Sequence, residues 1–96
     1  MMPSNSVEFL ALIDQTIVAA RKAVADARDK QVDSLAKQLL EVESFFCSLR
    51  QDVVLGKLPH SGGAGLGITK ELGESAPDDL YEAGKRVEDY FRSRWR

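Results

Sequence analysis

The fold is decided by residues 32–53, VDSLAKQLLEVESFFCSLRQDV, where apolar side chains recur at alternating intervals of three and four residues. The members of this series are Val32, Leu35, Leu39, Val42, Phe46, Leu49 and Val53. Such a heptad seam places every member on one side of an α-helix. We therefore predict a helix over residues 31–55, ended by Gly56, because glycine adopts the left-handed conformation of a helix C-terminus at little cost.

Residues 5–28 carry the same kind of pattern upstream. Their apolar series, again spaced by three and four residues, consists of Leu10, Ile13, Ile17, Ala20, Val24 and Ala27. Polar residues such as Asp14, Arg21 and Lys22 occupy the other faces. This segment is therefore predicted to form a second amphipathic helix.

Between the two segments the apolar spacing widens to five residues, from Ala27 to Val32. Two arrangements fit this slip. Either a tight turn makes an antiparallel hairpin, with Asp29 or Asp33 capping the second helix, or one helix of about fifty residues contains a stutter and forces a coiled-coil dimer. We favour the hairpin, because helices longer than about 25 residues are uncommon in small domains.

Glycine and proline shape the second half of the chain. Residues 4–54 contain neither, whereas all seven glycines lie at or beyond Gly56. We predict a glycine-rich loop over 57–67, a short turn over 68–73 and a helix over 77–95, since Pro77 and the acids after it suit a first helical turn. The expected fold is one all-α domain over 1–96, an antiparallel helical hairpin plus a C-terminal helix in a small three- to four-helix bundle.

Composition bounds the class of protein. The chain has 96 residues, 44% of them hydrophobic and 29% charged, with a formal net charge of −2. These values are typical of a soluble globular domain, and we expect neither a membrane nor a nucleic-acid partner. The lone Cys47 excludes an internal disulfide, and residues 1–5 show no secretory signal, so we expect a cytoplasmic location.

The glycine-rich loop is the one conspicuous motif. Its glycines miss the dinucleotide pattern G-x-G-x-x-G, and Ile68 stands where the phosphate-loop lysine belongs. We interpret the loop as a joint that lets two helices approach closely. The alternative is an anion-binding site, whose candidate residues are Gly63, Gly65, Gly67 and Lys70.

No residue set indicates catalysis. His60 is the only histidine, Cys47 lies far from it in sequence, and no acidic pair is better explained by chemistry than by helix termini. We expect no metal and no cofactor, and we lean towards a protein that is not an enzyme.

Two surfaces are candidates for protein partners. Residues outside the seam form a second apolar group, which either the C-terminal helix or a partner covers: Phe45, Val54, Leu55 and Leu58. The seam over 32–53 is itself a candidate for a homodimer contact.

The run Gly62-Gly63-Ala64-Gly65 between two amphipathic helices, followed by Ile68, Glu71 and Leu72, resembles a turn in small bacterial all-helical proteins of unknown function. Some of those resemble toxin-immunity proteins. The resemblance implies a binding or neutralising role and transfers no functional residue. The leading hypothesis is a non-enzymatic protein-binding module, immunity-type or regulatory. The alternative is a small anion- or nucleotide-binding protein or enzyme that uses the glycine-rich loop.

Overall fold

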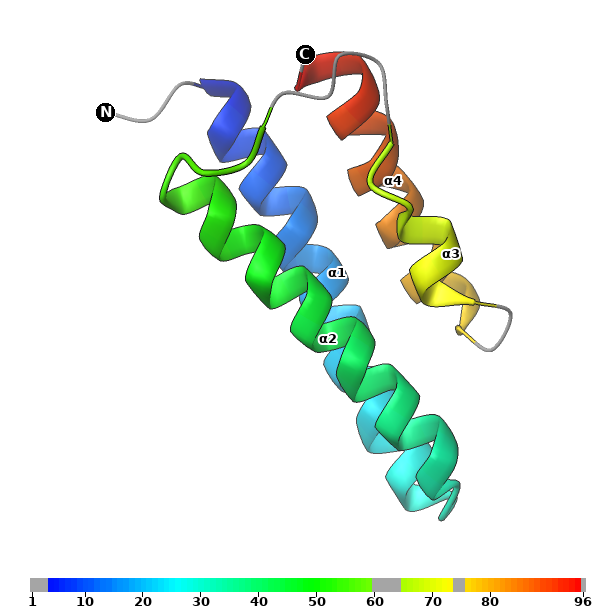
Figure 1. Cartoon of the computed structure of the whole chain (residues 1–96). Helices are drawn as coiled ribbons and strands as arrows, with labels where there is room; N and C mark the ends of the chain where they lie inside the picture. Colours follow the sequence, from blue (N-terminus) through cyan, green and yellow to red (C-terminus); the bar gives the residue numbers. More distant parts are fainter. Residues whose placement is uncertain (1–3, 60–64, 74–75, 96) are drawn as a thin grey trace.

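A computed structural model describes residues 4–59, 65–73 and 76–95, and helices are the only regular secondary structure in those ranges. They are, in chain order, α1 (Ser4–Asp29), α2 (Asp33–Val54), α3 (Ile68–Leu72) and α4 (Asp78–Arg94). The helices α1 and α2 run antiparallel as a long hairpin, α4 packs on α1, and the short α3 lies on α4 and also contacts α2 (Figure 1). The all-α prediction is confirmed, and residues 4–54 form the favoured hairpin, not the alternative single long helix.

The turn of the hairpin is made by the backbone. Gln31 adopts a left-handed conformation, with a φ of 59°. The amide of Gln31 donates to the carbonyl of Arg28 at 3.0 Å, and the amide of Val32 donates to that of Ala27 at 2.9 Å. These two bonds form a Schellman motif, which ends α1. The widened apolar spacing between Ala27 and Val32 therefore marks the end of α1.

The predicted cap of α2 is wrong. Val32 occupies the N-cap position, and no side chain caps this end. Neither Asp29 nor Asp33 therefore serves as the cap. Asp33 is instead the first helical residue, where its negative charge faces the positive end of the helix dipole.

Gly56 ends α2 as predicted. Its φ is 69°, and its amide donates to the carbonyl of Val53 at 3.2 Å, while the amide of Lys57 donates to that of Asp52 at 2.8 Å. This is the same Schellman motif as at the end of α1, here with glycine at the left-handed position. The two ends therefore share the same bonds and differ in the left-handed residue, which is Gln31 after α1 and the unstrained Gly56 after α2.

The heptad seam of 32–53 packs inside the monomer. Its buried members are Leu39, Val42, Phe46, Leu49 and Val53. They belong to the same core as Phe9 and Ile13 of α1 and Leu80 and Val87 of α4. The seam is therefore an intramolecular contact, and a homodimer through it would require the bundle to open.

The hairpin extends beyond α3 and α4 towards its turn, where only α1 and α2 lie side by side (Figure 1). The residues buried there are mostly small: Ala20, Ala23, Ala27 and Ala36. Small side chains let two helix axes approach closely, so this end of the hairpin buries its contact without a third helix. No described helix combines the length and the apolar character that crossing a membrane requires.

Candidate functional site

The glycine-rich loop is attached to α4 by a carboxylate. The backbone amide of Leu66 donates to Oε2 of Glu88 at 2.8 Å, and the amide of Gly67 donates to Oε1 at 3.1 Å. Glu88 is only 7% exposed. Buried charge is tolerated when it accepts hydrogen bonds, and these two amides are such donors. The loop therefore does bind an anion, but the anion is a side chain of the same protein.

Two glycines permit the close approach of this joint. A Cβ on Gly65 would lie 2.7 Å from Oε1 of Glu88 and 2.8 Å from Nε of Arg92. A Cβ on Gly84 of α4 would lie 2.7 Å from Cδ1 of Leu72 in α3. Both distances are shorter than real Cβ contacts, so a side chain at either position would require the facing side-chain tips to shift.

The structure describes three of the four candidate anion-binding residues. Gly63 and His60 lie outside the described residues. Gly65 and Gly67 lie beside Glu88, and Lys70 is exposed on α3. Because the amides of Leu66 and Gly67 are already bonded, a free anion would have to displace the Glu88 carboxylate.

The candidate partner patch is divided. Phe45 is half-buried against the core, with its ring edge-on to Phe46 at a centroid distance of 5.3 Å. Leu58 is also half-buried, and its carbonyl accepts a hydrogen bond from the Trp95 indole at 3.5 Å. Val54 and Leu55, in contrast, are 48% and 54% exposed.

Helix geometry explains the division. Nine residues separate Phe45 from Val54, and at about 100° per residue they lie on opposite sides of α2. The four residues therefore do not form one continuous patch. Phe45 and Leu58 belong to the margin of the core, and Val54 belongs to a different face.

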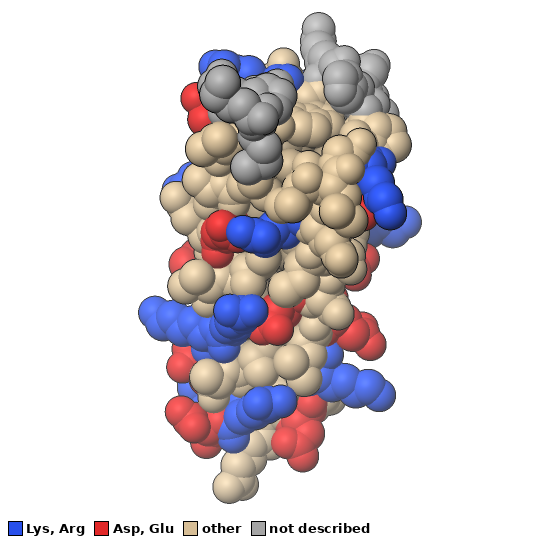
Figure 2. All heavy atoms as spheres, turned by 90° about the vertical axis from the view of Figure 1, so that its left-hand side faces the viewer, with Lys and Arg blue, Asp and Glu red and all other residues tan. Residues whose placement is uncertain are grey.

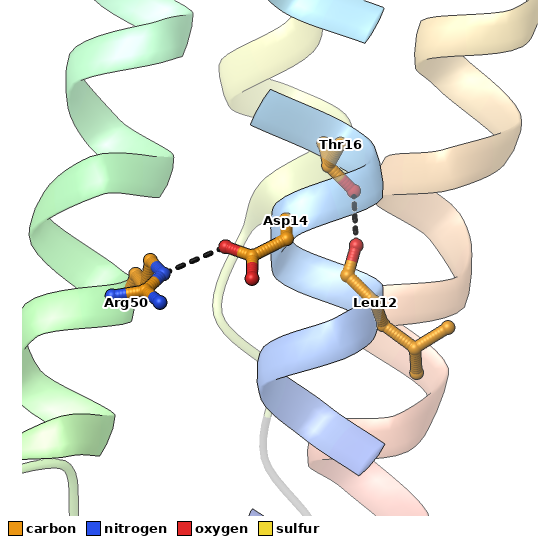
Figure 3. Close-up of polar contacts among 4 residues, drawn as sticks. All are labelled: Leu12, Asp14, Thr16 and Arg50. Carbon is orange, nitrogen blue, oxygen red and sulfur yellow. Dashed lines mark hydrogen bonds and ion pairs between the residues drawn. The ribbon is translucent and has the colours of Figure 1, made fainter. Parts of the chain in front are cut away.

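That face is a ladder of alternating charged and apolar pairs across the hairpin. Arg50 Nε of α2 contacts Asp14 Oδ1 of α1 at 2.7 Å (Figure 3). Farther towards the turn, Arg21 Nε lies 3.6 Å from Glu43 Oε1. Between these two ion pairs is a hollow of about 400 Å³, with Val18 and Cys47 in its lining. Val18 is 65% exposed, which makes it the most exposed large apolar side chain in the described ranges.

The same pattern continues along both helices at intervals of seven residues, or about two turns. Leu40, Cys47 and Val54 share one side of α2, and Ala11, Val18 and Ala25 share one side of α1. We call this surface the ladder face. It consists of Ala11, Asp14, Val18, Arg21, Ala25, Leu40, Glu43, Cys47, Arg50 and Val54.

The ladder face lies away from α3. A Cβ on Gly73, just after α3, would lie 3.4 Å from Nε2 of Gln38, so Gln38 marks the side of α2 that α3 covers. Cys47 follows nine residues later, on the opposite side of the helix. This face was not predicted, although Leu40, Cys47 and Val54 form a second seven-residue repeat beside the seam in the sequence.

A second hollow of about 540 Å³ lies between α1 and α4. Across it the Tyr90 hydroxyl donates to Oε2 of Glu8 at 3.3 Å. Burial raises the pKa of Tyr90, and the charge of Glu8 and its hydrogen bond raise it further, while Arg94 opposes the shift. The phenol is therefore protonated at neutral pH and acts as a hydrogen-bond donor that ties α1 to α4, and not as a base.

Charge is mixed over the side of the molecule in Figure 2, where positive and negative side chains are interspersed. Within the described ranges, no group of three or more His, Cys, Asp or Glu side chains is placed to hold a metal ion. No protein-family model matches the chain, and neither the curated proteins nor the solved structures contain a significant match. The fold is a small all-α helical bundle. A proposal for its function therefore depends on the surfaces described above.

Proposed function

We propose that this chain is a non-enzymatic protein-binding module and that the ladder face is its docking surface. The observation that supports the proposal is the exposure of three aliphatic side chains in register on two helices. Val18, Leu40 and Val54 are 65%, 38% and 48% exposed, although the same helices bury five members of the seam, from Leu39 to Val53, on their other side. With Cys47 between Leu40 and Val54 and with an alanine on each side of Val18, they form apolar series spaced by seven residues, which suit a partner that is itself helical.

The charges and apolar side chains of the ladder face limit the kind of partner that can bind there. Ion pairs flank the apolar centre at Asp14–Arg50 and Arg21–Glu43. A suitable partner therefore carries small aliphatic residues with charges of both signs between them, since unlike charges set the register of helical contacts. We favour an immunity-type or regulatory role, in which this chain acts by covering a partner's surface. The proposed location is the cytoplasm, where Cys47 stays reduced.

A small anion as the ligand has less support. The two loop amides that would bind it are bonded to Glu88. We therefore propose no phosphate or nucleotide function for the loop.

Substitution of Val18 tests the docking surface. Val18→Asp places a charge at the centre of the ladder face, whereas Tyr81→Asp places the same charge on an exposed part of α4. A partner retained from the host lysate by the immobilised wild-type protein would be purified, and its Kd would be measured for all three proteins. We expect Val18→Asp to weaken binding by about tenfold or more, because a carboxylate at an apolar contact must be desolvated. Equal affinity of the two variants, with unchanged circular dichroism, would contradict the proposal.

A further inference from the structure

The order of charges on the ladder face identifies an occupant. We infer that a second copy of this chain docks there, related to the first by a two-fold axis. This inference rests on the proposed function, which makes the ladder face a docking surface. A two-fold contact is made by one surface twice, so that surface must be complementary to itself.

The ladder face meets this requirement because the sign of its charges alternates along each helix. In α1 the negative Asp14 is followed by the positive Arg21, and in α2 the negative Glu43 is followed by the positive Arg50. The two ion pairs therefore cross the hairpin in opposite senses, Asp14 to Arg50 and Glu43 to Arg21. Val18 and Cys47 lie midway between them.

A two-fold axis that runs across the helices, through the middle of this arrangement, lays α1 on α1 of the second copy in the opposite direction. Asp14 then faces Arg21 of the second copy, and Arg50 faces Glu43 of the second copy. Val18 and Cys47 face their own equivalents at the centre. Every charge meets the opposite sign.

An axis that runs along the helices has the same outcome, because it lays α1 on α2 of the second copy at the same level. Asp14 then faces Arg50 of the second copy, and Arg21 faces Glu43. Had both acids been on α1 and both arginines on α2, an axis across the helices would have set like charges together. The alternation that the chain carries is the arrangement that suits both two-fold axes.

Apolar contact completes the interface. Val18, Leu40 and Val54 are exposed in the single chain and would be covered by the second copy. Ala11 and Ala25 are small, so they let helices of the two copies approach closely. The two hairpins would then form a four-helix arrangement with α3 and α4 on its outside.

Two charge-reversed variants test the inference without any assumption about the axis. The first, Asp14→Arg with Glu43→Arg, makes all four charges of the ladder face positive. The second, Arg21→Glu with Arg50→Glu, makes all four negative. At about 100 μM, we expect the wild type to sediment as a dimer, each variant alone to self-associate at least about 100-fold more weakly, and an equimolar mixture to form a heterodimer.

Matched controls separate this pairing from general attraction between oppositely charged proteins. Glu71→Arg with Glu82→Arg, and Lys70→Glu with Lys85→Glu, change the net charge by the same amounts at exposed positions of α3 and α4. We expect each control to remain a homodimer on its own, and a mixture of the two controls to gain no stronger association than either alone.

The inference is overturned if the wild type is monomeric, if either ladder-face variant still forms a homodimer, or if their mixture stays monomeric. If a ladder-face variant loses its helical circular dichroism, Val18→Asp takes its place and must be monomeric while folded. A monomeric wild type whose binding to a different purified partner is still lost in Val18→Asp would refute the second copy as occupant and leave the docking surface standing.

Discussion

The core side and the ladder face of the α1–α2 hairpin both carry apolar residues at helical spacing, but they differ in how densely those residues recur. On the core side, apolar residues recur every three or four positions and include large side chains such as Phe9 and Phe46, which are fully buried. On the ladder face, apolar residues recur only every seventh position, and ion pairs separate them. A dense apolar series buries enough surface to fold the chain, whereas a sparse series leaves a surface that the single chain tolerates and a partner can cover.

The largest expected effect contrasts the centres of the two sides. Phe46→Ala should lower the free energy of unfolding by about 3–5 kcal/mol, because it leaves a cavity where Phe46 contacts the other core residues. Val18→Ala should change the stability of the monomer by less than about 0.5 kcal/mol, since Val18 is exposed. Urea unfolding at a concentration low enough to keep the protein monomeric measures both. Similar losses for the two variants would remove the distinction between the sides.

The attachment of the glycine-rich loop to α4 should give the next largest effect. Glu88→Ala removes the acceptor of two backbone amides and should cost about 1–3 kcal/mol of unfolding free energy. Glu88→Gln keeps one acceptor oxygen and should cost less. Amide hydrogen exchange at Leu66 and Gly67 should accelerate more in the alanine variant. Unchanged exchange at both amides would mean that Glu88 does not hold the loop.

The ends of α1 and α2 offer a smaller, paired effect. Gln31→Gly should stabilise the protein by about 0.5–1 kcal/mol, because Gln31 has a φ of 59° that glycine adopts without strain. Gly56→Ala should destabilise it by about 1 kcal/mol, since Gly56 has a φ of 69° and no neighbour within 4 Å that could compensate. Thermal unfolding of the two variants checks both signs. Destabilisation by Gln31→Gly would show that the Gln31 side chain stabilises the turn.

The smallest expected effect is a dependence on alkaline pH at the α1–α4 hollow. The pKa of Tyr90 is raised in the folded protein, so the folded state favours the protonated phenol. The resulting stabilisation is complete below the unfolded pKa of about 10 and is lost as the pH rises through the folded pKa. The Tm of the wild type relative to that of Tyr90→Phe should therefore stay constant near neutral pH and fall in alkali. A difference that is constant with pH would exclude this titration.

Sequence periodicity predicts α1, α2 and their turn because long amphipathic series without glycine or proline leave few alternatives. The cap of α2 was mispredicted because the turn uses backbone bonds and a glutamine in the left-handed region, and Gln31 has no sequence signal for that conformation. The bond from the loop to Glu88 was missed because it joins residues 21 and 22 positions apart. This bond forms only where α4 packs beside the loop, and the spacing of apolar residues in the sequence does not specify that packing.

The candidate site was only partly predictable for a similar reason. Val54 was grouped with Phe45 as one apolar group covered by the C-terminal helix or by a partner, but the two residues lie on opposite sides of the helix and Val54 is exposed. The ladder face requires two helices in register, and the register follows from the position of the turn and from pairs such as Asp14–Arg50. The repeat is present in the sequence, and its exposure is a property of the tertiary structure.

Sedimentation equilibrium of Val18→Asp beside the wild type tests the central claim most directly, because one substitution addresses the ladder face without touching the core. We predict a dimer for the wild type and a monomer for Val18→Asp, with identical helical circular dichroism. A wild type and a variant with the same mass at every concentration would contradict the assignment of the ladder face as the surface on which a second copy docks.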